Sequence, residues 1–349
     1  MDIELVRKTL FKNTWIFNLF CSRMMQTFRG NIQKMFIVPY YHMVNDGEVL
    51  HIKHLYRHKS VKQFKEDLDY LLKRYKVISL FDLIKIYKNR CPVPQNSFLL
   101  TFDDGFREMY DIVYPILLEK GIPATFFINS DFSDNNEMCY LHKASILAEY
   151  ITDDLSFRII GKIREMLNEN DIHCEDIKRG VLLIQYQQRK IIDQMAQLID
   201  LDLKEYLARN KPYLTSKQIE NLIKYGFTIG GHSIDHPLYS SLSLNEQLLQ
   251  TIESVNFLKR RFGLTYGAFA FPHGDYMVSE EFFRRLFTNG LVDVCFGTGG
   301  MVEDEYPGNF QRISFEKPLI PAERILAVQF TRRIWNKSWI KGKRSRKRF

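Results

Sequence analysis

The strongest constraint in this sequence is a repeated alternation of strand patterns with amphipathic helix patterns. Short apolar runs typical of buried strands occur at 36–41, 77–79, 97–102, 124–128, 227–230, 267–271 and 292–296. Apolar residues at helical spacing follow between most of these runs, at 61–75, 81–87, 106–120, 245–262 and 280–288. Such alternation predicts a parallel sheet covered by helices, and about seven strand-helix units favour an α/β barrel over an open sheet.

The alternation is interrupted once, between residues 133 and 215, where helical periodicity prevails and strand signals are few. We therefore predict a barrel domain over 36–330 that carries a helical insertion at about 133–215. We expect the insertion to form one wall of the cleft. The flanking segments differ from this body, because 1–35 has the pattern of a basic amphipathic segment and 331–349 is a basic tail.

The net charge of +8 belongs to the C-terminal tail. Nine of the 49 Lys and Arg residues lie between 332 and 349, where no acid occurs, which leaves 40 bases against 41 acids elsewhere. A near-neutral body offers no extended basic surface, so we do not expect nucleic acid as a partner. All three tryptophans, Trp15, Trp335 and Trp339, lie in the basic terminal segments. This composition is typical of helices at a membrane surface, and packing on the barrel is an equal alternative.

Export and membrane signals are weak in this sequence. No apolar run reaches the roughly 18 to 20 residues of a membrane span, and the N-terminal pattern lacks a signal-peptide cleavage site. The five cysteines are odd in number and form no CxxC pair, which favours neither a disulfide framework nor a thiolate zinc site. We expect a cytoplasmic protein, with peripheral association at the inner face of the membrane as the alternative.

Three polar segments follow predicted strands, at the end where parallel α/β proteins assemble their sites. They are TFDDG at 101–105, GHSIDH at 231–236 and FPHG at 271–274. Asp103 and Asp104 are adjacent carboxylates, and a cation would relieve their mutual repulsion. His232 and His236 are four residues apart, so a helical turn would place both rings on one face. One carboxylate would then complete a metal site with two His ligands.

Each of these segments also has an ordinary structural interpretation. An Asp-Asp-Gly sequence is usually a turn or a helix N-cap, two His at this spacing are usually packed or solvated, and Pro-His-Gly is usually a tight turn. Their coincidence at one end of the predicted strands favours a common site. We interpret His51, His54 and His58 as solvated loop residues, and for His42 a core position is as consistent with the sequence as a position at the site.

Together the segments resemble the motifs of the polysaccharide deacetylases, carbohydrate esterase family four. The residues 101–105 are similar to the family's TFDDG motif, and 232–236 are similar to its H-S-x-x-H motif. Further similarities are PYYHMV at 39–44, FAFPHG at 269–274 and FGTG at 296–299. The resemblance covers roughly residues 36–315, with the helical insertion inside it.

This resemblance implies a deformed (β/α) barrel with one divalent metal ion, usually zinc, that removes acetyl groups from N-acetylated sugars. By the resemblance, Asp104, His232 and His236 would be the metal ligands and Asp103 the general base. Such a set can activate water, accept its proton and stabilise the oxyanion of the tetrahedral intermediate. The residues that would line the substrate site are His42, Phe271, Pro272 and Gly274.

Two features depart from the family pattern. Ala270 stands where many members have an Arg that orients the base, and Arg312 is the substitute that we predict. The family's late Leu-x-His motif, whose His is the general acid, is missing because His273 is the last histidine of the chain. His273 itself is therefore a candidate acid, with water or Asp103 as alternatives.

The sequence thus predicts a metal-dependent hydrolase that removes N-acetyl groups from a cell-envelope polysaccharide or its precursor. The two departures keep open the alternative of a catalytically impaired glycan-binding or scaffold protein on the same fold. An iron-dependent oxygenase would use similar ligands, but it would leave Asp103 without a task. The identity of the sugar, and the choice between N- and O-deacetylation, stay open at this point.

Overall fold

The structure is a computed structural model that describes residues 35–288, 290–339 and 343–344. The predicted amphipathic segment, except for its last residue, lies outside the described residues, and so does Trp15. Side chains beyond residue 333 are not described, so the surface expected around Trp335 and Trp339 stays a prediction. Among the described residues, no helix combines the length and the apolar character that crossing a bilayer requires.

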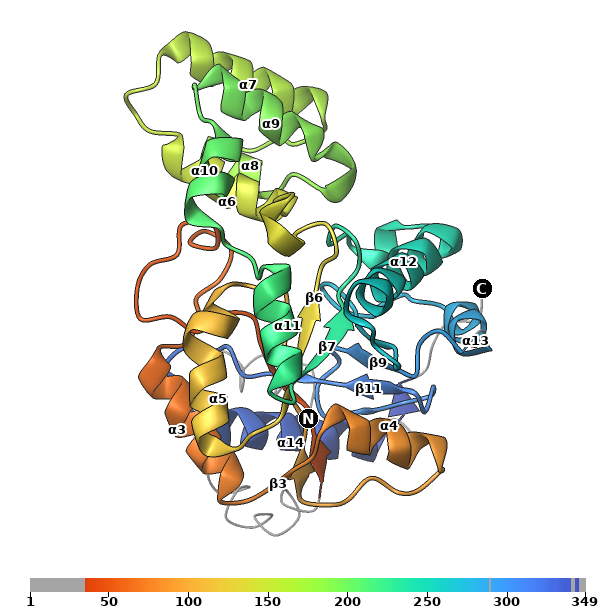
Figure 1. The fold of residues 1–349 in the computed structure, drawn as a ribbon. Helices are drawn as coiled ribbons and strands as arrows, with labels where there is room; N and C mark the ends of the chain where they lie inside the picture. The colour runs from red at the N-terminus through yellow and green to blue at the C-terminus, as the bar shows by residue number, and fades with distance from the viewer. Residues whose placement is uncertain (1–34, 289, 340–342, 345–349) are drawn as a thin grey trace, which may run out of the picture.

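In the described part of the chain, eight short parallel strands form a sheet that nearly closes on itself (Figure 1). Across the sheet the order is β11 (Asn309–Gln311), β9 (Val294–Gly297), β8 (Ala268–Ala270), β7 (Thr228–Gly231), β6 (Ala124–Ile128), β5 (Leu100–Phe102), β2 (Pro39–Tyr41) and β12 (Ile313–Ser314). Only Arg312 separates β11 from β12, so one chain segment pairs with β9 at one edge and with β2 at the other. The prediction of a deformed barrel of about seven strands is confirmed, since β11 and β12 are two halves of one strand. Its membership differs from the prediction: the run at 77–79 contributes to β3, which lies in a separate sheet, and the strand at 309–314 was not predicted.

The strands are continuous apolar runs because both of their faces are buried. Every residue of β5, β6 and β8 is buried. Successive side chains point to opposite faces, so Phe126 stacks on Phe102 while Phe127 packs against Phe296. Next to the barrel, β1 (Phe36–Ile37), β4 (Ser97–Phe98) and β3 (Lys76–Val77) form a second parallel sheet. The barrel is therefore a packed core. Threonines within its strands are hydrogen-bonded, as Thr101 is to the Pro39 carbonyl, and the carboxylates and imidazoles of the polar motifs lie at the strand ends.

Helices cover the outside of the barrel. They are α3 (Val61–Leu72), α4 (Leu80–Lys88), a π-helical stretch (Met109–Val113) that leads into α5 (Tyr114–Lys120), α11 (Ser216–Lys224), α12 (Leu244–Phe262), α13 (Glu280–Thr288) and α14 (Ala322–Trp339). Four of these helices begin with a reciprocal capping box, which satisfies free N–H groups of the helix's first turn. The capping residues are Ser60, Ser79, Thr215 and Ser243. α14 runs without a break past residue 331, where we expected the tail to begin. Beyond it, β13 (Lys343–Arg344) pairs in parallel with β10 (Glu303–Asp304).

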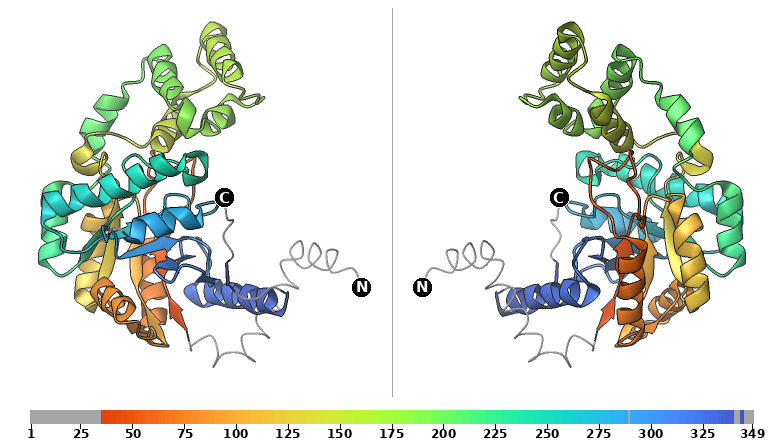
Figure 2. Two further views of the ribbon diagram at one scale, coloured as in Figure 1. Left: turned by 90° about the vertical axis from the view of Figure 1, so that its right-hand side faces the viewer. Right: turned by 90° about the vertical axis from the view of Figure 1, so that its left-hand side faces the viewer.

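Five α-helices lie within residues 133–215, all of which are described, and form a layer beyond the carboxyl ends of β6 and β7 (Figures 1 and 2). They are α6 (Tyr140–Tyr150), α7 (Phe157–Glu169), α8 (Ile177–Leu182), α9 (Lys190–Leu198) and α10 (Leu203–Asn210). Short 3-10 turns occur at Ser133–Asn135, at Tyr186–Gln188 and, outside the insertion, at Tyr239–Ser241. The insertion has its own apolar core, which continues into the barrel loops through Met43 and Phe106. It therefore covers the end of the barrel that carries the polar motifs.

Candidate active site

Adjacent Asp103 and Asp104 follow β5 and face different partners. Asp104 has a φ of +68° and Gly105 a φ of +65°, so the chain turns sharply after Asp103. The turn sends the Asp103 carboxylate toward Arg312 and the Asp104 carboxylate toward His236. The repulsion that two neighbouring carboxylates would otherwise suffer is thus relieved, because each has its own partner.

Asp104, His232 and His236 form a buried triad at the carboxyl ends of β5 and β7. Oδ1 of Asp104 lies 3.4 Å from Nε2 of His232 and 3.2 Å from Nε2 of His236. One ligand atom from each residue lies within 4.8 Å of the others, and the three side chains are almost fully buried. Burial alone would raise the pKa of Asp104, but His236, His232 and His42 together outweigh it and hold that pKa well below its ordinary value.

The hydrogen bonds of the triad leave its inner atoms without partners. The carbonyl oxygen of Ala270 lies 2.8 Å from Nδ1 of His232. A carbonyl only accepts, so Nδ1 carries the proton and Nε2 presents a lone pair. Among the described residues, neither this Nε2 nor Oδ1 of Asp104 has a hydrogen-bond partner. Unpaired buried polar groups cost about 1 to 3 kcal/mol each, and a cation between them would satisfy both atoms. These residues therefore fit a divalent metal ion.

The helical turn that we expected between His232 and His236 is absent. Residues 232–236 form an irregular loop in which Ser233 has a φ of +70° and His236 a φ of +64°. The His236 N–H donates to the Ser233 hydroxyl at 3.0 Å, and the two imidazole rings lie 5.2 Å apart. Left-handed backbone at non-glycine residues costs about 1 to 3 kcal/mol each and persists only where the surroundings enforce it. The expectation that the two rings meet is correct, but helical periodicity is the wrong reason for it.

Arg312 lies against Asp103, at the junction between β11 and β12. Its Nη1 and Nη2 donate to Oδ1 and Oδ2 of Asp103 at 2.6 and 2.7 Å. Arg312 is wholly buried, and its guanidinium lies 4.7 Å from the centre of the Tyr40 ring. Burial acts to raise the pKa of Asp103, but Arg312 outweighs it, so that pKa lies below its ordinary value. The structure thus places Arg312 in contact with the carboxylate that it was expected to orient.

His42 follows β2 and pairs with Glu316, a residue that sequence reasoning missed. Nδ1 of His42 lies 2.5 Å from Oε2 of Glu316, whose Oε1 accepts from the N–H groups of His42 and Met43 at 3.0 and 2.7 Å. Nε2 of His42 lies 4.0 Å from Oδ2 of Asp103. Burial would lower the pKa of His42, but Glu316 reverses this and raises it to about 9. The contact with Glu316 therefore favours the protonated form of His42. The sequence did contain a signal for Glu316. Arg312, Ser314 and Glu316 are spaced two residues apart, which places them on one face of a strand.

The other predicted site residues lie around the third motif. The ring of His273 lies 4.6 Å from that of His236, but among the described residues His273 forms no ion pair with a carboxylate. Phe271 is wholly buried against Tyr239, Phe269 and Phe282, so its ring is a core group that a substrate does not reach. Pro272 is buried as well. Gly274 has a φ of +122°, and a Cβ there would lie 2.3 Å from the Thr298 hydroxyl, so only glycine fits.

The loop histidines are not all solvated, contrary to our expectation. His51 is buried against Phe106 and His142. Nε2 of His54 lies 2.8 Å from a carboxylate oxygen of Glu149, which comes from α6. The expectation was wrong because the sequence did not reveal that the insertion covers this loop.

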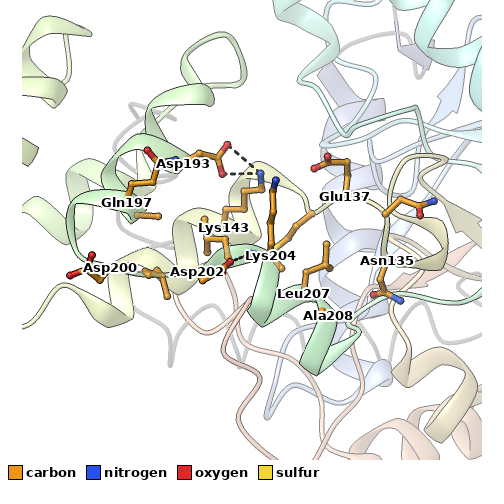
Figure 3. Close-up of a pocket in the computed structure, with 15 residues that line it drawn as sticks. Asn135, Glu137, Lys143, Asp193, Gln197, Asp200, Asp202, Lys204, Leu207 and Ala208 are labelled. Carbon is orange, nitrogen blue, oxygen red and sulfur yellow. Dashed lines mark hydrogen bonds and ion pairs between the residues drawn. The ribbon is translucent and has the colours of Figure 1, made fainter.

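A cavity of about 1090 Å³ lies in the insertion, between the segment 135–138 and helices α6, α9 and α10 (Figure 3). Lys143 of α6 extends into it and pairs with Asp193 of α9 at 3.0 Å. None of the predicted site residues is among the described residues that line this cavity. Unpaired ligand atoms, and not cavity volume, therefore identify the candidate site.

Comparison with known proteins places this geometry in a family. The family model for polysaccharide deacetylase matches residues 90–284, which is more than half of the chain. The chain belongs to the polysaccharide deacetylase family. The match contains Asp103, Asp104 and both histidines of the triad, but it ends before Arg312 and begins after His42. Arg312 and His42, which lie against Asp103 in this polysaccharide deacetylase, are thus outside the matched segment.

Two individual relatives are informative in different ways. The poly-beta-1,6-N-acetyl-D-glucosamine N-deacetylase of Staphylococcus epidermidis is 25% identical over 188 residues, which are 48% of this chain and 60% of that protein. The chain thus spans about three fifths of the length of this relative. The structure of the Streptococcus pyogenes deacetylase PplD in complex with acetate is similar with a TM-score of 0.52 and 15% identity, over 84% of this chain and 97% of that chain. The second likeness concerns the fold alone.

Proposed function

We propose that this protein is a metal-dependent N-deacetylase of an N-acetylated glycan. The observation that carries the proposal is the arrangement of two sets side by side: the buried Asp104, His232 and His236 triad, and buried Asp103 between Arg312 and the partly exposed His42. The first set fits a metal ion, and the second combines a carboxylate that can accept a proton with an imidazolium that can donate one. Hydrolysis of an amide requires both transfers.

Asp104, His232 and His236 would hold the metal ion. When bound, a divalent ion such as zinc would polarise the acetamide carbonyl and make water more acidic. Nδ1 of His232 is committed to the Ala270 carbonyl, so its Nε2 is fixed as the ligand atom. Ala270 is thus compatible with metal-dependent hydrolysis. Its backbone carbonyl orients the ligand His232, although its side chain cannot orient Asp103.

Asp103 would accept a proton from the attacking water. Arg312 holds both of its oxygens and keeps the carboxylate ionised, while each oxygen retains a second lone pair. The water oxygen forms a bond to the acetyl carbon, and the carbon-nitrogen bond then breaks. His42, protonated through its contact with Glu316, would give its Nε2 proton to the departing nitrogen. The products are acetate and a free amine.

These contacts favour an enzyme over a silent binding module. The contact of Arg312 with Asp103 supports giving it the task of the missing base-orienting Arg, and the contact of His42 with Glu316 supports giving His42 the task of the missing acid. His42 is a better candidate acid than His273, since a carboxylate partner holds its proton. The relative from Staphylococcus epidermidis, named for N-deacetylation of a poly-N-acetylglucosamine, supports a polymeric N-acetylated glycan as the substrate class.

The test measures metal content and acetate release on the same samples, with an N-acetylglucosamine oligomer as substrate. We expect one equivalent of metal in the wild type and in Asp103→Asn, loss of metal in His232→Ala, and metal retained in the exposed control His173→Ala. Asp103→Asn should lose about 10²-fold to 10⁴-fold in kcat. No metal after reconstitution would overturn the proposal. Metal without acetate release from any N- or O-acetylated glycan would favour the binding module.

A further inference from the structure

Two groups of contacts hold the loop between the two candidate His ligands. The segment 129–131 contacts its first residues, with Nδ2 of Asn129 donating to the Ser233 hydroxyl at 3.2 Å, and the side chain of Asp235 makes the contacts near its end. Oδ2 of Asp235 accepts from the Tyr186 hydroxyl at 2.6 Å and lies 3.5 Å from Nη2 of Arg189. Oδ1 accepts from Nε2 of Gln250 at 2.8 Å. Asp235 directly precedes His236, so these contacts fix the backbone from which that ligand extends.

The partners of Asp235 come from two different parts of the fold. Tyr186 and Arg189 belong to the helical insertion, just before α9, while Gln250 belongs to α12 of the barrel. Gln250 also accepts from the N–H of Ile234 at 2.8 Å, so the loop is held at two consecutive residues. The insertion and the barrel therefore hold the loop from two sides. The insertion contacts Asp235, and its Cys139 side chain also contacts the His236 ring.

The loop needs such support because its conformation is unfavourable. Ser233 and His236 have left-handed backbone without being glycine, and surrounding contacts have to enforce this geometry. The Ser233 hydroxyl supplies one contact within the loop. From outside the loop, its last residues are held by the contacts of Asp235 and Ile234 described above and by the N–H of Asp131, which donates to the Ile234 carbonyl at 3.2 Å.

We propose that Tyr186 and Asp235 are positioning residues through which the helical insertion holds His236 in its metal-binding place. The inference rests on the proposed function only for the identity of the three ligands. The insertion then does more than form one wall of the cleft. Its contact with the loop 232–236 keeps the metal ion bound. Tyr186 acts through Asp235 and touches no ligand atom itself.

Tyr186→Phe is the informative substitution, because it removes the hydroxyl and keeps the ring. The ring packs under the Arg189 guanidinium at 3.9 Å and against Tyr140 at 5.9 Å, and phenylalanine retains both contacts. Loss of a hydrogen bond that orients a metal ligand indirectly costs about 10-fold or more in metal affinity. We therefore expect metal to dissociate about 10-fold faster from Tyr186→Phe than from the wild type.

The matched control is Gln187→Ala, the neighbouring residue of the same turn. Nε2 of Gln187 donates to the hydroxyl of Ser241 at 2.9 Å, so it joins the insertion to the same connection without touching Asp235. Full-length proteins loaded with zinc are mixed with an excess of chelator, and zinc release is followed with time. The kcat and KM for acetate release are then measured at limiting and at saturating zinc.

We expect faster zinc release from Tyr186→Phe but not from Gln187→Ala. At saturating zinc, the kcat of Tyr186→Phe should equal that of the wild type, and its KM for the glycan should be unchanged. Asp235→Asn combined with Tyr186→Phe should release zinc no faster than the faster single variant, because both act on one contact. Equal release from Tyr186→Phe, Gln187→Ala and the wild type would overturn the inference and leave the deacetylase proposal intact. A wild type that binds no zinc would instead refute the ligand assignment on which both depend.

Discussion

Replacing Glu316 by Gln tests whether His42 is the proton donor. The substitution removes the charge 2.5 Å from Nδ1 of His42, while the amide oxygen of Gln can still accept from the backbone N–H groups of His42 and Met43. The fold around the strand end should therefore persist. What changes is the pKa of His42, because Glu316 is the group that raises it against the effect of burial.

The size of the effect follows from the protonated fraction of His42. With a pKa of about 9, nearly all of His42 is protonated at about pH 7.5. With an ordinary pKa of about 6.5, only about one tenth is protonated, and burial without Glu316 lowers this fraction further. We therefore expect kcat/KM at about pH 7.5 to fall at least about 10-fold. The charged groups that face His42 besides Glu316 are Asp103 and Asp104, and the substitution leaves both unchanged.

The assay is the pH dependence of kcat/KM for acetate release from an N-acetylglucosamine oligomer at saturating zinc. The alkaline limb of the wild type should lie near pH 9 and move down to about pH 6.5 or lower in Glu316→Gln. Glu119→Gln, at an exposed position on α5, is the control for loss of one negative charge. An alkaline limb that stays in place in Glu316→Gln would refute the reasoning, since His42 would then not be the titrating donor.

Two further predictions concern the other buried ion pairs. Arg312→Met leaves the Asp103 carboxylate buried without its cation, so the pKa of Asp103 should rise. The acidic limb of the pH profile of kcat/KM should then move to higher pH. A limb that stays in place would contradict the role of Arg312. Lys59 is fully buried, pairs with Asp67 at 2.5 Å and also donates to the Ile320 carbonyl. Lys59→Met leaves Asp67 without its cation, so we expect the free energy of unfolding, measured with denaturant, to fall by about 3 to 5 kcal/mol. The exposed control Lys62→Met should change stability by less than about 0.5 kcal/mol, and equal effects would show that burial of the pair is unimportant.

The barrel was predictable because its elements follow from local periodicity. The run at 124–128 forms β6 with the predicted bounds, and the pattern at 245–262 forms α12 with a capping box at its start. Strand 97–102 appears as β4 and β5, and the helix expected from 106 begins with a π-helical stretch near Met109. The strand divides at Leu99 because β4 pairs with β1 and β3 while β5 pairs with β2 and β6, a change of sheet that no local pattern shows.

The candidate site was predictable only in part. The residue types of the triad and their place after β5 and β7 were correct, whereas the loop geometry that joins His232 to His236 was not. Left-handed backbone at Ser233 and His236 carries no sequence signal, because nothing about either residue type requires it. The contacts of Asp235 that support this loop come from Tyr186 and Gln250, which no local pattern connects with it.

The sequence by itself determined most of the strands and helices of the barrel and the polar residues that stand at the strand ends, since burial on one or both faces fixes those patterns over a few residues. It did not reveal the strand at 309–314. Only the tertiary structure decided the partners. Arg312 meets Asp103 across 209 residues, and Glu316 meets His42 across 274. Both contacts exist because the segment 309–314 closes the barrel between β9 and β2. Closure depends on the whole sheet, so no local pattern specifies which distant charge it brings to a buried carboxylate or imidazole.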